Sequence, residues 1–123
     1  MAPVRDRTAM IAEMDPDLTP GEWTFVTDPP AGTATLATIA EDEGLSAIVA
    51  ADDAPPDTPR MRRITLRVRS DLEGVGLTAA VAGALASVGI ACNMVAGHHH
   101  DHAFVPARDA ARALAILHDL AAS

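Results

Sequence analysis

The segment that most constrains the fold is residues 52–59, which run Asp-Asp-Ala-Pro-Pro-Asp-Thr-Pro. Proline lacks the N–H that a β-ladder needs, so three prolines among eight residues cannot lie inside a sheet. The charge balance also changes near this segment: residues 1–60 carry twelve acidic side chains and three Arg, whereas residues 61–123 carry five and six. The segment therefore predicts a linker between two units, residues 1–58 and residues 59–123.

The first unit is expected to have the order α-β-α-β and to be incomplete. Residues 5–14 and 33–42 have apolar side chains at helical spacing, and Gly44 is placed to end the second helix. Residues 22–27 alternate between apolar and polar side chains, and residues 45–50 form a short apolar run, so both predict strands.

The second unit is more regular. Its strand at residues 62–69 places apolar side chains on one face and polar ones on the other, namely Ile64, Leu66 and Val68 against Arg63, Thr65, Arg67 and Arg69. A helix at 72–88 follows, then a strand at 90–96, a turn at Gly97 and His98, a strand at 99–105 and a helix at 106–121.

The resulting order, β-α-β-β-α, is a ferredoxin-like unit without its last strand. A strand of the first unit is expected to complete it, and the sequence does not show which one. The fold class is therefore α+β, with antiparallel sheets and helices packed on one face. The arginine face of residues 62–69 is expected to meet the acidic side chains of the first unit.

Composition excludes several classes of function. A net charge of −8 repels phosphate backbones, so nucleic acid is not an expected partner. A single cysteine, Cys92, forms no disulfide framework. The first residues lack the apolar run of a signal peptide, and no stretch is long and apolar enough to span a bilayer. We expect a cytoplasmic protein without a membrane partner.

Three stretches of the second unit carry a resemblance to a known family. Residues 63–66 (Arg-Ile-Thr-Leu) with 72–81 (Leu-Glu-Gly-Val-Gly-Leu-Thr-Ala-Ala-Val), residues 89–93 (Gly-Ile-Ala-Cys-Asn) and residues 100–106 (His-Asp-His-Ala-Phe-Val-Pro) follow in order. They resemble small bacterial ACT-domain proteins with paired ACT-like units, which are similar to the ACT units of the CASTOR-type arginine sensors. The resemblance covers residues 62–120 well and the first half by the order of its elements.

The resemblance implies a non-catalytic regulatory protein that binds an amino acid or a related small molecule at an interface between ACT units. It further implies a homodimer, since ferredoxin-like units expose strand edges that pair side by side. The ligand contacts of the arginine sensors correspond here to a carboxylate and two backbone segments: Asp101; Gly74, Val75 and Gly76; Ile90, Ala91 and Cys92. The histidines before Asp101 are a departure that leaves the ligand's identity open.

Each candidate also has a simpler interpretation. Asp101 could hold the hairpin, Gly74 to Gly76 could form a tight strand-to-helix turn, and Cys92 could be a small buried side chain. The glycines do not form a dinucleotide motif, because position 79 is Ala79 and no acidic residue is placed for a ribose. The sequence therefore predicts no cofactor, no catalytic residue and no enzyme.

Two alternatives remain open at this point. His98, His100 and His102 would share one face of a strand, and two histidines at positions i and i+2 can bind one metal ion. This alternative predicts a metal-binding protein that uses the cluster of residues 98–102. The other alternative is an ACT module that dimerises and takes no ligand.

Overall fold

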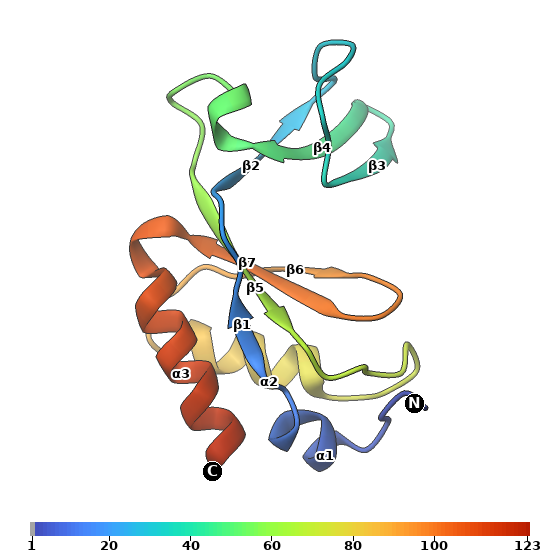
Figure 1. Ribbon diagram of the computed structural model, residues 1–123, viewed down its shortest axis with the longest axis vertical. Helices are drawn as coiled ribbons and strands as arrows, with labels where there is room; N and C mark the ends of the chain where they lie inside the picture. The colour runs from blue at the N-terminus through green and yellow to red at the C-terminus, as the bar shows by residue number, and fades with distance from the viewer. Residues whose placement is uncertain (1) are drawn as a thin grey trace.

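The computed structural model describes residues 2–123, which form one sheet and three α-helices (Figure 1). The elements in chain order are α1 (Arg7–Ala12), β1 (Pro16–Leu18), β2 (Trp23–Thr27), β3 (Ala37–Glu41), β4 (Gly44–Ala50), η1 (Ala51–Asp53), β5 (Met61–Leu66), α2 (Leu77–Ala86), β6 (Asn93–Ala96), β7 (Asp101–Pro106), η2 (Ala107–Asp109) and α3 (Ala110–Ala122). The strand order is β3-β4-β2-β5-β7-β6, and every pairing between these strands is antiparallel. This confirms the predicted α+β class.

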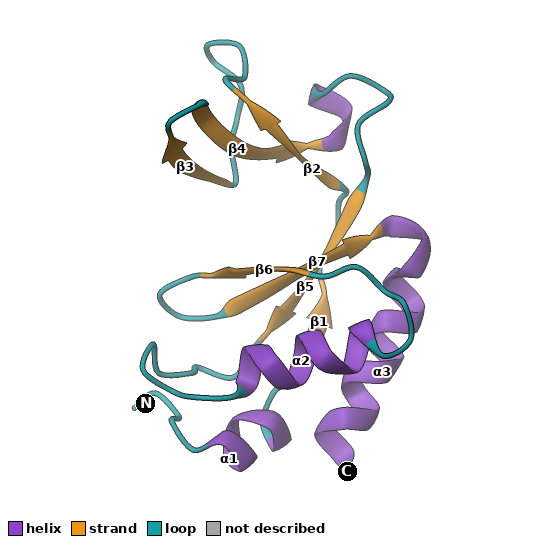
Figure 2. Cartoon of the chain, turned by 180° about the vertical axis from the view of Figure 1, so that it is seen from behind, coloured by secondary structure: helices purple, strands orange, loops and turns teal. Residues whose placement is uncertain are grey.

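The helices cover one face of the sheet formed by β1, β5, β7 and β6 (Figure 2). Ile64 and Leu66 of β5 point toward these helices and are fully buried against Leu85 of α2 and Leu117 of α3. Strands β2, β3 and β4 curl away above this layer and carry η1 and loops (Figure 1). A smaller buried cluster of Ile48, Met61 and Phe104 joins the two parts of the sheet.

The strand that completes the second unit is β1. It pairs antiparallel with β5, with Pro16 opposite Leu66 and Leu18 opposite Ile64. After residues 19–22 the chain crosses from this lower part of the sheet to β2, where Trp23 pairs with Met61 and then with Ala50 of β4. Residues 2–18 thus belong physically to the helix-covered layer, and the division at residues 58 and 59 stays a prediction.

The helix predicted at residues 33–42 is wrong. Residues 37–41 form β3, which pairs with β4 through a two-residue turn at Asp42 and Glu43. Gly44 begins β4 with a φ of 139°, and does not end a helix. Pairing with the adjacent strand β4 decides the conformation, because a ladder of five pairs outweighs weak helical spacing in a segment with three threonines and one isoleucine.

Other predicted boundaries also shift: β5 ends at Leu66 and not at residue 69, and β7 begins at Asp101 and not at residue 99. Helix α2 begins at Leu77 and not at residue 72, because Gly76 adopts a left-handed φ of 110° immediately before it. Leu77, Val81 and Leu85 are buried as predicted, whereas Val88 lies beyond the helix and is 43% exposed. Strand β6 begins at Asn93, three residues later than predicted.

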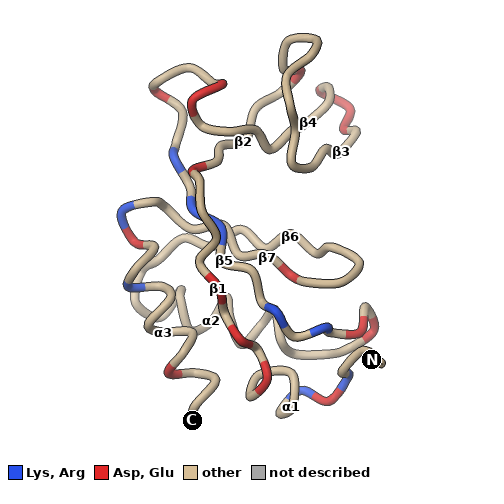
Figure 3. The backbone as a smooth tube through the Cα atoms, viewed as in Figure 1, with Lys and Arg blue, Asp and Glu red and all other residues tan. Residues whose placement is uncertain are grey.

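Two arginines that flank β5, Arg60 and Arg67, pair with acidic side chains of the first half, whereas Arg63 within β5 donates to the Thr19 hydroxyl. Of the predicted arginine face, Arg67 thus meets an acidic partner as expected; Figure 3 shows where the charged residues lie along the chain. Arg67 binds Asp17 at 2.7 Å, and Arg60 binds Glu22 and Asp52 at 2.5 and 2.6 Å. These pairs are well exposed to water, so each contributes little to stability. Within residues 2–123, no helix combines the length and the apolar character needed to cross a bilayer.

Candidate functional site

A small cavity lies at the start of α2 and brings three of the predicted site residues together. Its volume is about 150 Å³. Asp101, Gly74 and Gly76 line it from β7 and from the segment between β5 and α2. The other lining residues come from α1, the same segment, α2 and β6, namely Met10, Ser70, Asp71, Leu72, Leu77, Thr78 and Ala96.

Asp101 is one of two acidic residues that line this cavity, the other being Asp71. Asp101 is the first residue of β7 and lies opposite Leu66 of β5 and Ala96 of β6. Its side chain is half-buried, and Oδ2 accepts a hydrogen bond of 3.3 Å from the Ser70 hydroxyl. Since a carboxylate has about four acceptor positions, Asp101 has capacity for a further donor such as an ammonium group.

Gly74 and Gly76 line the same cavity at positions where a larger residue would not fit. A Cβ at Gly74 would lie 3.0 Å from the Met10 sulfur, and one at Gly76 would lie 2.5 Å from the Arg7 Cδ. Val75, between them, points outward and is 78% exposed. The backbone of this turn therefore lies unusually close to the cavity and to α1.

Helix α2 presents its N-terminus to the cavity. Gly76 is its N-cap and supplies no side-chain acceptor, so no side-chain cap bonds the first-turn N–H groups. Those groups and the helix dipole favour an anion at this end. The lining of the cavity thus includes the carboxylates of Asp71 and Asp101 and an anion-attracting helix end.

Residues Ile90, Ala91 and Cys92 lie elsewhere in the same chain. They follow the far end of α2, and its ten residues span about 15 Å. Ile90 is 2% exposed within the main core, Ala91 is exposed, and Cys92 is half-buried beside that core. Burial raises the pKa of the Cys92 thiol.

Sequence reasoning missed Met10 and Ser70, which line this cavity, and Arg7, whose side chain lies against Gly76. Arg7 and Met10 come from α1, more than sixty residues before the turn that they contact. Nothing local in the sequence indicates that contact. The Ser70 hydroxyl bonds Asp101, which is thirty-one residues away in the chain.

The predicted metal face is not formed. Residues 98–100 lie in the turn between β6 and β7, which the Gly97 N–H closes by a bond of 2.9 Å to the His100 carbonyl. His98, His100 and His102 therefore do not alternate along one strand, and that prediction is wrong. Across residues 2–123, no three or more His, Cys, Asp or Glu side chains gather in a way that could hold a metal ion.

His102 lies on β7, with its Nδ1 3.0 Å from the Thr65 hydroxyl. Its pKa is lowered, first because burial disfavours the charged ring and then because of the positive charge of Arg63. A histidine with a lowered folded-state pKa stabilises the fold above its unfolded pKa of about 6.5, and this contribution is lost as the pH falls below that value.

We therefore expect the free energy of unfolding to fall between about pH 7 and about pH 5, and His102→Gln to make this fall less steep. Urea unfolding of both proteins across this range measures the two slopes. The remaining histidines are common to both proteins, so their contribution cancels in the comparison. Identical slopes would contradict the prediction.

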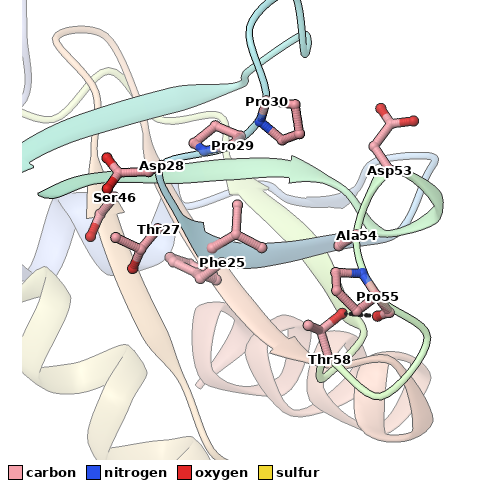
Figure 4. A pocket seen from close by; sticks show the side chains of 11 residues that line it. Phe25, Thr27, Asp28, Pro29, Pro30, Ser46, Asp53, Ala54, Pro55 and Thr58 are labelled. Carbon is pink, nitrogen blue, oxygen red and sulfur yellow. Dashed lines mark hydrogen bonds between the residues drawn. The ribbon is translucent and has the colours of Figure 1, made fainter.

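Two larger cavities border the β2–β4 part of the sheet. One, of about 460 Å³, lies over β2 between Pro29 and Pro30 on one side and the loop after η1 on the other, where the Thr58 hydroxyl donates to the Pro55 carbonyl (Figure 4). The other, of about 360 Å³, is a groove between β3 and β6. The sequence predicted neither.

Comparisons with known proteins connect this geometry to a family. A family model described as an ACT domain matches residues 60–119, and a second model with the same description matches residues 3–57. No curated protein matches the chain.

Two solved structures have a similar fold. A Vibrio cholerae protein described as of unknown function and as a possible transport protein is 36% identical, with 93% of this chain and 94% of that chain covered and a TM-score of 0.81. The ligand-free regulatory subunit of aspartate kinase from Thermus thermophilus is 14% identical, with 85% and 95% covered and a TM-score of 0.61. The latter similarity concerns the fold alone. Because models described as ACT domains together match residues 3–57 and 60–119, the chain belongs to the ACT-domain proteins.

Proposed function

We propose that this protein is a non-catalytic regulatory protein that binds an amino acid, or a related small molecule, in the cavity at the start of α2. The observation that carries the proposal is the pairing of Asp101 with the uncapped N-terminus of α2 across one cavity. An α-amino acid carries an ammonium and a carboxylate group on one carbon. Asp101 would accept from the ammonium, and the first-turn N–H groups would donate to the carboxylate.

Arg7 adds to the positive side of this proposed site. Its side chain approaches Gly76, so a ligand carboxylate at the helix end would have a guanidinium nearby. The cavity of about 150 Å³ is small, and the ligand's side chain would extend beyond it. Each chain would contain two ACT-like units, residues 1–58 and residues 59–123. We propose that the protein forms a homodimer in which an ACT-like unit of the second copy covers the ligand's side chain. Ile90, Ala91 and Cys92 would contribute from that copy.

The ligand is found by a thermal-shift screen of the purified protein against the twenty amino acids. A ligand at a hundredfold excess over its dissociation constant stabilises the native state by about 2.7 kcal/mol. For a domain of this size, such a gain raises the midpoint of unfolding by roughly 5–15 °C. A screen without any shift would overturn ligand binding and leave a dimerising module.

Asp101→Asn is then compared with the unchanged protein by calorimetric titration of the amino acid that raised the midpoint of unfolding. The substitution keeps the size of the side chain and removes its charge, so we expect affinity to fall by about ten- to a hundredfold. Asp119→Asn, on the exposed side of α3, is the matched control and should bind normally. Equal affinity for Asp101→Asn and Asp119→Asn would show that the site is misplaced.

A further inference from the structure

The groove between β3 and β6 lies where the sheet fails to close. These are the two end strands of the sheet order, yet both line one groove of about 360 Å³. Figures 1 and 2 show them on the same side of the molecule, β3 above β6. The sheet is therefore curled toward a barrel, with the groove as its opening.

The walls of the groove are apolar. They include Phe25, Ile39, Ile48, Met94 and Val95. Ile39 is 62% exposed and Phe25 is 43% exposed, although both are large apolar side chains. Three consecutive residues of β3 and three of β6 line the groove, so it borders the backbone edges of both strands as well as their side chains.

These edges carry backbone groups that point away from their own partner strands. The two-residue turn makes Glu41 and Gly44 a hydrogen-bonded pair, so Ile39 and Ala37 also bond β4. Alternation then directs the N–H and C=O of Thr38 and Ala40 outward. An extended polypeptide matches this spacing of donors and acceptors, whereas a compact small molecule does not.

The charged residues around β3 indicate which charge a partner should carry. Residues 23–59 contain seven acidic side chains and neither Arg nor Lys. Three of the seven, Glu41, Asp42 and Glu43, lie at the tip of the β3–β4 hairpin (Figure 3). A second copy of this chain has a net charge of −8 and would be repelled there. Its own arginine-rich strand β5 lies in the middle of the sheet and is not available for pairing.

We propose that the groove between β3 and β6 binds an extended, basic segment of a partner protein, which adds to β3 as a further strand. Apolar side chains at every second position of the segment fill the groove, and its lysines or arginines face the acidic hairpin. The proposal goes beyond ligand binding and does not depend on it. Ala96 lines both the ligand cavity and this groove, so the docking surface adjoins the proposed sensor site.

The test uses two blocked octapeptides, one alternating Lys and Val and the other alternating Glu and Val, with binding followed by fluorescence anisotropy. We expect the lysine peptide to bind at least tenfold more tightly than the glutamate peptide, and its affinity to fall with added salt. Backbone amide shifts in the NMR spectrum should change in β3, β4 and β6. Equal binding of the two peptides would overturn the proposal.

Thr38→Pro removes an outward N–H of β3 without removing a bond to β4, and Thr38→Val is its matched control. Thr38→Pro should weaken binding of the lysine peptide at least tenfold, and Thr38→Val should leave it unchanged. If circular dichroism shows that Thr38→Pro is unfolded, Ile39→Ser replaces it, with Val88→Ser as the control, since Val88 is also an exposed apolar residue and lines neither the groove nor the ligand cavity. Binding of the lysine peptide to the groove variant as tightly as to the unchanged protein overturns the proposal. So does a wild-type dimer that Thr38→Pro converts to a monomer, because a second copy would then occupy the groove.

Discussion

Phe104→Ala is expected to lower the free energy of unfolding by about 3–5 kcal/mol, close to the whole stability of many small domains. Phe104 is 1% exposed and lies on the face of β7 opposite the helices. Its ring meets that of Phe25 edge-on, with centroids 5.6 Å apart. With Ile48 and Met61 it forms the buried cluster that joins the β2–β4 strands to the rest of the sheet.

Urea unfolding measures the loss, and Phe25→Ala is the control. Both substitutions remove one member of the same ring pair, but Phe25 is 43% exposed and buries less apolar surface. Phe25→Ala should therefore cost clearly less than Phe104→Ala. In Phe104→Ala, amide hydrogen exchange should quicken more in β3 and β4 than in α2, because the cluster anchors the former. Equal losses in the two variants would mean that Phe104 does not hold the two parts together.

The second half of the fold could be predicted because its sequence repeats at the period of its structure. Ile64, Leu66, Val81 and Leu85 recur at strand and helix spacing, and all four are fully buried. Local pattern and tertiary packing agree in this half, so the pattern alone was sufficient. The same agreement underlies the family resemblance, which the comparisons confirm for residues 60–119.

The first half was harder because its elements depend on distant partners. Leu36, Ile39 and Ala40 have helical spacing, yet residues 37–41 pair with β4. Strand β1 has three residues, and its register against β5 is set by a contact almost fifty residues away in the chain. Short strands of this kind leave little periodicity to detect.

The candidate site was likewise predictable from the sequence only in part. The glycine turn and Asp101 could be named from the sequence, and they share one cavity. The contacts of Arg7 and Met10 with that turn require α1 to pack beside α2, which no local pattern encodes. The histidines failed as a strand face because Gly97 places the turn at residues 98–100. Strand alternation cannot apply within that turn.

Gly44→Ala tests the turn that makes β3 a strand and not a helix. Gly44 has a φ of 139°, which strains any residue with a Cβ. A Cβ there would also lie 2.5 Å from Asp28 Oδ2, while Asp28 Oδ1 accepts the Leu45 N–H at 2.8 Å. Relieving the clash moves Asp28 and breaks that bond, so we expect a loss of about 2–5 kcal/mol.

The matched control is Gly32→Ala, since Gly32 also has a positive φ, of 85°, but a Cβ there would meet nothing within 4 Å. Its cost should be that of backbone strain alone, about 1–3 kcal/mol. The difference between the two unfolding free energies therefore isolates the contact with Asp28. Measured against Asp28→Ala alone, Gly44→Ala should then cost only backbone strain, because a Cβ at position 44 no longer meets the Asp28 carboxylate. If the two glycine substitutions cost the same, the Asp28 carboxylate does not hold the hairpin, and the pairing of β3 with β4 must draw its stability from the ladder alone.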